Sequence, residues 1–135
     1  AIPRSLEEVV VNVTESDSAA VPMPHERLDV WQVALAFDRA VVAATREAPR
    51  GHAWLGDQAA RAAGSAVLNL AEGLGREGAD RIRVLRISRG SLLEADAAVV
   101  LLAHRGACRA ATRDGVHAIA RRLNALVHGL CRAAG

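Results

Sequence analysis

The sequence contains no lysine and no tyrosine, and all 17 of its basic residues are arginine. A Walker-type phosphate loop needs a lysine, and so does a Schiff-base or pyridoxal enzyme, so these classes of protein are excluded. Aromatic residues are almost as scarce, because Trp31, Phe37 and Trp54 are the whole set. So few aromatic side chains argue against sequence-specific recognition of single-stranded nucleic acid, which relies on base stacking.

Long apolar runs and cysteines are also rare. No uncharged apolar run reaches the roughly 18 residues that a membrane span requires, and even the run 90–103 is interrupted by Glu94 and Asp96. The first residues are acidic and lack the positively charged start of a signal peptide. Cys108 and Cys131 fall in helical patterns and do not form a dense cysteine framework. We therefore expect a cytoplasmic protein with reduced thiols and no membrane partner.

What the sequence does contain is one domain's length of chain, 135 residues, of which 51% are hydrophobic. Alanine, leucine and valine dominate, and such a composition suits closely packed helices. Residues 1–26 hold one arginine and five acids, for a charge of −4, whereas residues 27–135 hold sixteen arginines and ten acids, for +6. The charge layout predicts an acidic leader and linker over residues 1–26 and a basic globular part over 27–135.

The leader contains a valine-rich run followed by a Ser-, Ala- and Pro-rich linker over residues 16–24. One interpretation is a mobile tail. The other is an extended strand that docks on a partner or on a neighbouring subunit, since an isolated strand needs an edge to pair with. In that case the partner-binding residues are Val9, Val10, Val11 and Val13.

Beyond the leader, apolar residues recur at spacings of three and four. They predict helices over about residues 27–48, 55–76, 79 or 80 to 105, and 112–132. Gly73, Gly75 and Gly78 are expected to stop the second helix, Gly106 the third, and Thr112 to be the N-cap of the fourth. The predicted fold is all-α, an antiparallel up-down-up-down four-helix bundle with an extended N-terminal leader.

A polar stripe runs along one side of the second helix and continues on the third. The favoured interpretation is a structural hydrogen-bond network that fixes the register of the two helices; a pocket for a ligand or ion and a solvated face are the alternatives. The residues of the stripe are Gln58, Arg61, Ser65, Asn69, Glu72, Arg76, Ser88, Ser91 and Glu94.

Two parts of this stripe are specific enough to suggest a family. The run Ser65-x-x-x-Asn69-x-x-Glu72-Gly73, followed by Gly90-Ser91-x-x-Glu94, resembles the four-helix-bundle family of ribosomal-RNA intervening-sequence proteins. That family includes the accessory variability-determinant protein of diversity-generating retroelements. The opening Leu28-Asp-Val-Trp31-Gln32 is also similar, whereas Val84-Leu85 replaces an aromatic that is usual there, and residues 1–26 lie outside the resemblance.

The resemblance implies a ring-shaped homopentamer with a basic surface. It also implies that RNA or DNA, and a reverse transcriptase or another protein, are possible partners, because the retroelement member binds nucleic acid and the reverse transcriptase that it assists.

Several arginines fall on the outer faces of the predicted helices. Guanidinium groups pair bidentately with phosphate, so these side chains are candidates for binding nucleic acid, although a solvated helix face is the simpler interpretation. The candidates are Arg39, Arg46, Arg50, Arg83, Arg86, Arg121, Arg122 and Arg132.

Catalytic and metal-binding patterns are missing from the sequence. The Glu-x-x-His pattern of di-metal bundles fails at Glu72 and Glu94, and His104 with Cys108 offers two metal ligands at most. We expect no enzyme activity, metal or cofactor. The leading hypothesis is an oligomeric accessory or adaptor protein that binds nucleic acid or a nucleoprotein partner. The rival is a protein–protein scaffold ring, attached to its partner by the N-terminal strand.

Overall fold

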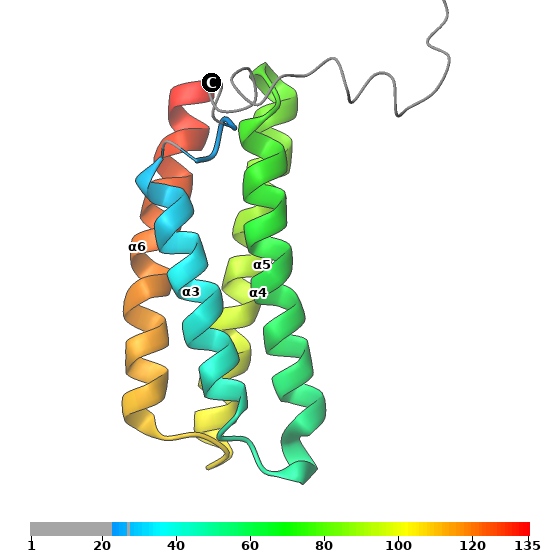
Figure 1. Cartoon of the computed structure of the whole chain (residues 1–135), viewed down its shortest axis with the longest axis vertical. Coiled ribbons are helices and arrows are strands. Elements are labelled where there is room, and N and C mark those ends of the chain that lie inside the picture. Colours follow the sequence, from blue (N-terminus) through cyan, green and yellow to red (C-terminus); the bar gives the residue numbers. More distant parts are fainter. Residues whose placement is uncertain (1–22, 27) are drawn as a thin grey trace, which may run out of the picture.

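The computed structural model describes residues 23–26 and 28–135, and the predicted valine-rich strand therefore lies outside the described residues. The described part contains four long helices, α3 (Asp29–Thr45), α4 (Ala53–Leu74), α5 (Gly78–His104) and α6 (Ala110–Ala134). A short 3-10 helix, η1 (Arg50–His52), lies between α3 and α4. The long helices stand side by side and alternate in direction (Figure 1). The predicted antiparallel four-helix bundle is confirmed, and no strand occurs in the described residues.

Two pairs of helices make up the bundle. The α4–α5 pair has the most extensive contact, and α3 and α6 close the other side by packing against each other and against α4 and α5, respectively. Phe37 and Val41 of α3 are fully buried, as are Val116 and Val127 of α6 to within 2%. A side chain of this size contributes about 1.5–3 kcal/mol when it is fully buried, so this core supports all four helices. Among residues 23–26 and 28–135, none of the helices offers an apolar stretch of the length that a bilayer span needs.

Small residues allow α4 and α5 to approach closely. Ala59, Ala63 and Ala66 of α4 and Ala95 of α5 are buried to within 2%. Gly73 goes further, since a Cβ at this position would lie 2.9 Å from Leu85 Cδ2 and 3.2 Å from the Leu85 backbone nitrogen. The prediction that Gly73 stops α4 is therefore wrong. The helix continues through it, and glycine stands there because the neighbouring helix leaves no room for a side chain.

The end of α5 is set by Gly106, as the sequence predicted. This glycine has a φ of +73°, in the left-handed region that favours glycine. Its N–H donates to the Ala103 carbonyl at 3.0 Å, and the N–H of Ala107 donates to the Leu102 carbonyl at 2.8 Å. This pair of bonds is a Schellman motif, and the buried Ala107 completes it with an apolar contact.

Glu47, which follows α3, joins the end of that helix to the start of α6. Its carboxylate accepts hydrogen bonds from the backbone N–H of Arg109 at 3.1 Å, from Arg109 Nε at 3.0 Å and from Thr112 Oγ1 at 2.6 Å. These donors, the Arg109 guanidinium first, lower the pKa of Glu47 from 4.5 to about 2. The prediction that Thr112 is the N-cap of the last helix is wrong, because Arg109 occupies the cap position and the Thr112 hydroxyl bonds to Glu47.

Gly73 and Gly64 provide a matched pair of substitutions in α4. Gly73→Ala should lower the free energy of unfolding by about 1–3 kcal/mol, because the new methyl group overlaps Leu85. Gly64→Ala should raise it by about 1 kcal/mol, since a Cβ there meets nothing within 4 Å and alanine is the better helix former. Urea denaturation of both variants measures the difference. Equal effects of the two substitutions would contradict the close approach of α4 and α5.

The contribution of Glu47 should depend on pH. A carboxylate whose folded pKa is lowered stabilises the native state above its ordinary pKa of 4.5, and that stabilisation is lost as the pH falls toward 2. Glu47→Gln should therefore be less stable than the natural protein at about pH 7, and the difference should vanish near pH 2. Urea midpoints of both proteins across this range test the expectation. A difference that persists unchanged at the acidic end would refute it.

Candidate nucleic-acid interface

The polar stripe predicted from the sequence lies along the contact between α4 and α5. Gln58 Nε2 donates to Glu94 Oε1 at 2.7 Å, and the hydroxyls of Ser65 and Ser91 lie 2.9 Å apart. Asn69 Nδ2 donates to the Ser65 carbonyl at 2.9 Å and to Ser65 Oγ at 3.1 Å. The Gln58–Glu94 and Ser65–Ser91 bonds link the two helices at two levels, and the Asn69 amide supports Ser65 from within α4.

Ser88 is the most deeply placed member of this set. It is 2% exposed, and its hydroxyl donates to the Ala66 carbonyl at 2.6 Å. Arg61, by contrast, is exposed and makes no side-chain hydrogen bond within the described residues. The structure therefore brings six of the nine residues together across α4 and α5, namely Gln58, Ser65, Asn69, Ser88, Ser91 and Glu94.

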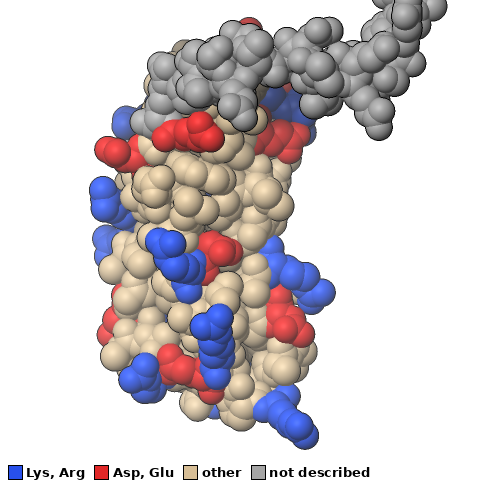
Figure 2. All heavy atoms as spheres, viewed as in Figure 1, with Lys and Arg blue, Asp and Glu red and all other residues tan. Residues whose placement is uncertain are grey.

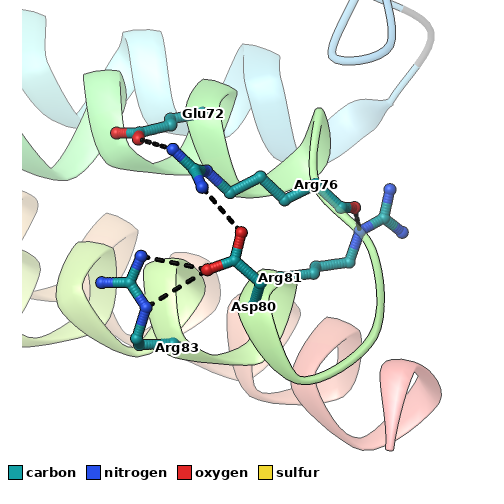
Figure 3. Close-up of polar contacts among 5 residues, drawn as sticks. All are labelled: Glu72, Arg76, Asp80, Arg81 and Arg83. Carbon is teal, nitrogen blue, oxygen red and sulfur yellow. Dashed lines mark hydrogen bonds and ion pairs between the residues drawn. The ribbon is translucent and has the colours of Figure 1, made fainter.

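Glu72 and Arg76 form a separate group where α4 turns into α5 (Figure 3). Arg76 donates to Glu72 Oε1 at 2.7 Å and to Asp80 Oδ2 at 2.6 Å. Arg83 donates to Asp80 Oδ1 at 3.0 Å, and the Arg76 and Arg83 guanidinium groups together lower the pKa of Asp80. Arg81 donates to the Arg76 and Leu74 carbonyls, both at 2.7 Å, and so satisfies the last carbonyl of α4 and one in the connection to α5.

These ion pairs join the end of α4 to the start of α5, and one of them involves a candidate for nucleic-acid binding. Arg83 was a candidate for phosphate binding, but its charge is paired with Asp80. Glu72, Arg76, Asp80 and Arg83 are all between 39% and 60% exposed, so each ion pair contributes little stability on its own. We assign this cluster to the helix connection.

The remaining candidate arginines do not all share one face. Arg39 and Arg46 are exposed on the outer side of α3, and Arg50 lies in η1. Arg122 lines a groove between α3 and α6. On the side shown in Figure 2, the basic side chains are separated by acidic and uncharged ones.

A concentrated basic site exists between α5 and α6. A cavity of about 240 Å³ there is lined by three arginines and a histidine. A smaller hollow of about 80 Å³ is lined by residues that include Arg121 and Asn124. Arg89 connects the two, because its Nε donates to Asn124 Oδ1 at 2.9 Å. We call this the α5/α6 groove, and its polar lining residues are Arg86, Arg89, Asp96, His117, Arg121, Asn124, His128 and Arg132.

The charges along the α5/α6 groove are uneven. Arg86 and Arg132 are exposed, and Arg89 is half-buried with only its Nε used in its bond to Asn124, which leaves its two terminal NH2 groups to donate elsewhere. At the other end, His117 Nδ1 lies 2.8 Å from Asp96 Oδ2, and the other oxygen of Asp96 is buried and makes no hydrogen bond within the described residues. The basic side chains are therefore concentrated around Arg86, Arg89 and Arg132, where no acidic side chain is among the described lining residues.

Arg89 is the member of this site that the sequence reasoning missed. It follows Arg86 by three residues, and that spacing places both side chains on the α6 side of α5. Its neighbours Ser88 and Gly90 belong to the polar stripe and to the family motif, so this part of the helix was interpreted only as a contact with α4. The spacing of Arg86 and Arg89 was the signal that could have found it.

His104 and Cys108 do not offer paired metal ligands in the way that their spacing suggested. Helix α5 ends at His104, and Cys108 lies in the connection to α6, so the two residues do not share a helix face. The Cys108 thiol is directed toward the Val99 carbonyl at 3.9 Å, and burial raises its pKa. In the described residues, no group of three or more histidine, cysteine or acidic side chains is arranged to hold a metal ion.

The fold and the α4–α5 contact define a small four-helix-bundle protein in which two helices are held by serine, glutamine and glutamate side chains. The sequence model of the 23S rRNA-intervening sequence protein family matches residues 26–129. The chain therefore belongs to this family, which confirms the resemblance seen in the Ser65–Gly73 and Gly90–Glu94 motifs. None of the curated proteins matches the chain.

The buried and exposed bonds between α4 and α5 should differ in strength. Ser88→Ala should lower the free energy of unfolding by about 1 kcal/mol, because a buried hydrogen bond is lost. Gln58→Ala should change it by less than about 0.5 kcal/mol, because the bond from Gln58 to Glu94 lies at the exposed edge. Chemical denaturation of both variants provides the comparison. A larger loss for Gln58→Ala would mean that the register depends on the edge of the contact.

Proposed function

We propose that this protein is a non-catalytic, oligomeric accessory or adaptor protein that binds nucleic acid, or a nucleoprotein partner, through the α5/α6 groove. The observation that carries the proposal is the convergence of Arg86, Arg89 and Arg132 on one cavity of about 240 Å³. Three guanidinium groups around one hollow repel one another, so an anion that binds among them relieves this repulsion.

Phosphate suits this site better than an isolated carboxylate. A guanidinium group offers paired N–H donors that match the oxygens of a phosphate, and successive phosphates can follow a groove between two helices. The chain has too few aromatic residues to stack bases, so the proposed contact is with the sugar-phosphate backbone. Binding of this kind weakens steeply with salt and depends little on sequence.

Self-association is the second part of the proposal. The outer side of α5 exposes Ile87, Val100 and Leu101, which are 36–44% exposed, and Leu68 of α4 is 70% exposed. A second copy of the chain that covers these side chains would remove them from water. The family resemblance implies a ring of five copies. Because the α5/α6 groove borders the outer side of α5, such a ring would present the basic site once in each copy.

The exposed apolar residues also favour a second candidate function, a protein–protein scaffold without a nucleic-acid role. In that case another protein, and not RNA or DNA, binds the assembled ring. The two candidates differ in their dependence on salt, since apolar contacts are far less sensitive to ionic strength than phosphate contacts.

Two matched double variants test the nucleic-acid proposal. Arg86→Ala with Arg132→Ala removes two charges from the α5/α6 groove, and Arg39→Ala with Arg46→Ala removes the same charge from the outer side of α3. The first pair should weaken binding of labelled duplex RNA or DNA at least about tenfold. It should also reduce the slope of log K against log salt by about 1.8, since each phosphate contact contributes about 0.9. Fluorescence anisotropy over a salt series measures both quantities.

Native mass spectrometry of the same proteins measures the number of copies per assembly independently of nucleic-acid binding. We expect five copies in the natural protein and in both double variants, since none of the four substitutions replaces an exposed apolar residue. If the natural protein shows no salt-dependent binding, or if both double variants lose the same affinity, the α5/α6 groove is not a nucleic-acid site. A ring without binding would favour the scaffold.

A further inference from the structure

The end of the α5/α6 groove that lies away from Arg86 and Arg132 has a different chemistry. Its hollow of about 80 Å³ is lined by Leu93, Asp96, His117, Ala120, Arg121 and Asn124. The Asp96 side chain is 16% exposed, and its Oδ2 lies 2.8 Å from Nδ1 of His117, whose side chain is 50% exposed. The other oxygen of Asp96 is buried and has no hydrogen-bond partner in the described part of the chain. The phosphate contacts proposed for the groove do not use this pair.

The charge of the His117–Asp96 pair makes it a poor site for phosphate. A carboxylate only accepts hydrogen bonds, so the hydrogen of the contact belongs to Nδ1 of His117. With a neutral ring the pair is negative, and Nε2 accepts a hydrogen bond. With a protonated ring the two charges cancel, and Nε2 donates one. Because the pair is positive in neither state, it does not attract an anion.

A hydroxyl group suits the pair in both states, because a hydroxyl both donates and accepts hydrogen bonds. A water molecule occupies about 30 Å³ in the liquid, so the hollow has room for such a group. The sugar-phosphate backbone offers a hydroxyl within a strand only in RNA, as the 2′-hydroxyl of the ribose. A DNA strand in the same place would leave Nε2 of His117 without a partner from the sugar.

We propose that His117, held by Asp96, recognises the 2′-hydroxyl of RNA and gives the α5/α6 groove a preference for RNA over DNA. The preference presupposes the proposed binding of nucleic acid to that groove. Arg89 and Asp96 are seven residues apart on α5, which corresponds to about 10 Å along the helix. A few nucleotides of a strand cover this distance, so phosphates at the arginine end leave a ribose beside His117. Arg121, which is exposed at the same hollow, pairs with the phosphate next to that ribose.

Three duplexes of one sequence test this proposal, because shape is the other cause of a preference for RNA. Duplexes of RNA and of DNA differ in the width and depth of their grooves as well as in the 2′-hydroxyl. A 2′-fluoro RNA duplex keeps the RNA shape, but its fluorine cannot donate a hydrogen bond. Fluorescence anisotropy at one fixed salt concentration compares the three. The natural protein should bind RNA about fivefold tighter than 2′-fluoro RNA and DNA, the change expected from one hydrogen bond.

Two histidine variants then assign the preference to a side chain. His117→Phe keeps a ring in the hollow but removes both nitrogens, so it should bind RNA and 2′-fluoro RNA equally. His104→Phe makes the same replacement at the exposed end of α5, outside the groove, and should retain the roughly fivefold difference. Circular dichroism checks that both variants keep their helices.

The outcomes separate this proposal from the proposed function. Equal binding of RNA and 2′-fluoro RNA by the natural protein would refute recognition of the hydroxyl, while salt-dependent binding of both would leave the groove as a nucleic-acid site. A difference that survives in His117→Phe would also refute it. Absence of salt-dependent binding to all three duplexes would overturn the nucleic-acid proposal and the preference for RNA together.

Discussion

The close approach of α4 and α5 is the constraint on which the rest of the structure depends. At Gly73 the neighbouring Leu85 comes so near that a Cβ would overlap it, and buried alanines continue the same contact along both helices. Short side chains contribute little apolar area each, so the hydrogen bonds of Ser65, Ser88 and Ser91 fix the register that bulkier side chains would otherwise set.

Fixing α5 against α4 also determines what α5 presents to the other side. Ser88 points toward α4 and donates to the Ala66 carbonyl, while the next residue, Arg89, donates to Asn124 of α6. Consecutive residues of a helix lie about 100° apart around its axis, so a helix held in one orientation serves both neighbours. The basic α5/α6 groove is thus positioned by the contact between α4 and α5, and a slip in the register would move Arg86 and Arg89 away from Arg132.

Much of this arrangement could be predicted from the sequence. Apolar spacing placed the four helices to within a few residues, and the serine-, asparagine- and glutamate-containing motifs indicated the family that the comparison confirmed. The role of Gly73 could not be predicted, because a glycine near a helix end is equally typical of a stop signal, and only the position of Leu85 distinguishes the two. Thr112 was misjudged for a similar reason, since its partner Glu47 lies 65 residues away in the sequence.

The candidate site was predicted less well than the fold. Eight arginines on outer helix faces were candidates, but sequence spacing does not show which faces adjoin each other across the bundle. The structure gathers Arg86 and Arg132 around one cavity with Arg89, pairs Arg83 with Asp80, and leaves Arg39, Arg46 and Arg50 apart. The groove between α3 and α6 was also invisible in the sequence, because Ala36 and Ala118 look like ordinary core residues until their helices are placed together.

Native-state hydrogen exchange tests the central role of the α4–α5 contact most directly. If this contact holds the fold, amides in the middle of α4 and α5 exchange only through global unfolding, whereas α3 and α6 open at a lower free energy. Equal protection of all four helices, or the greatest protection in α3 and α6, would contradict it.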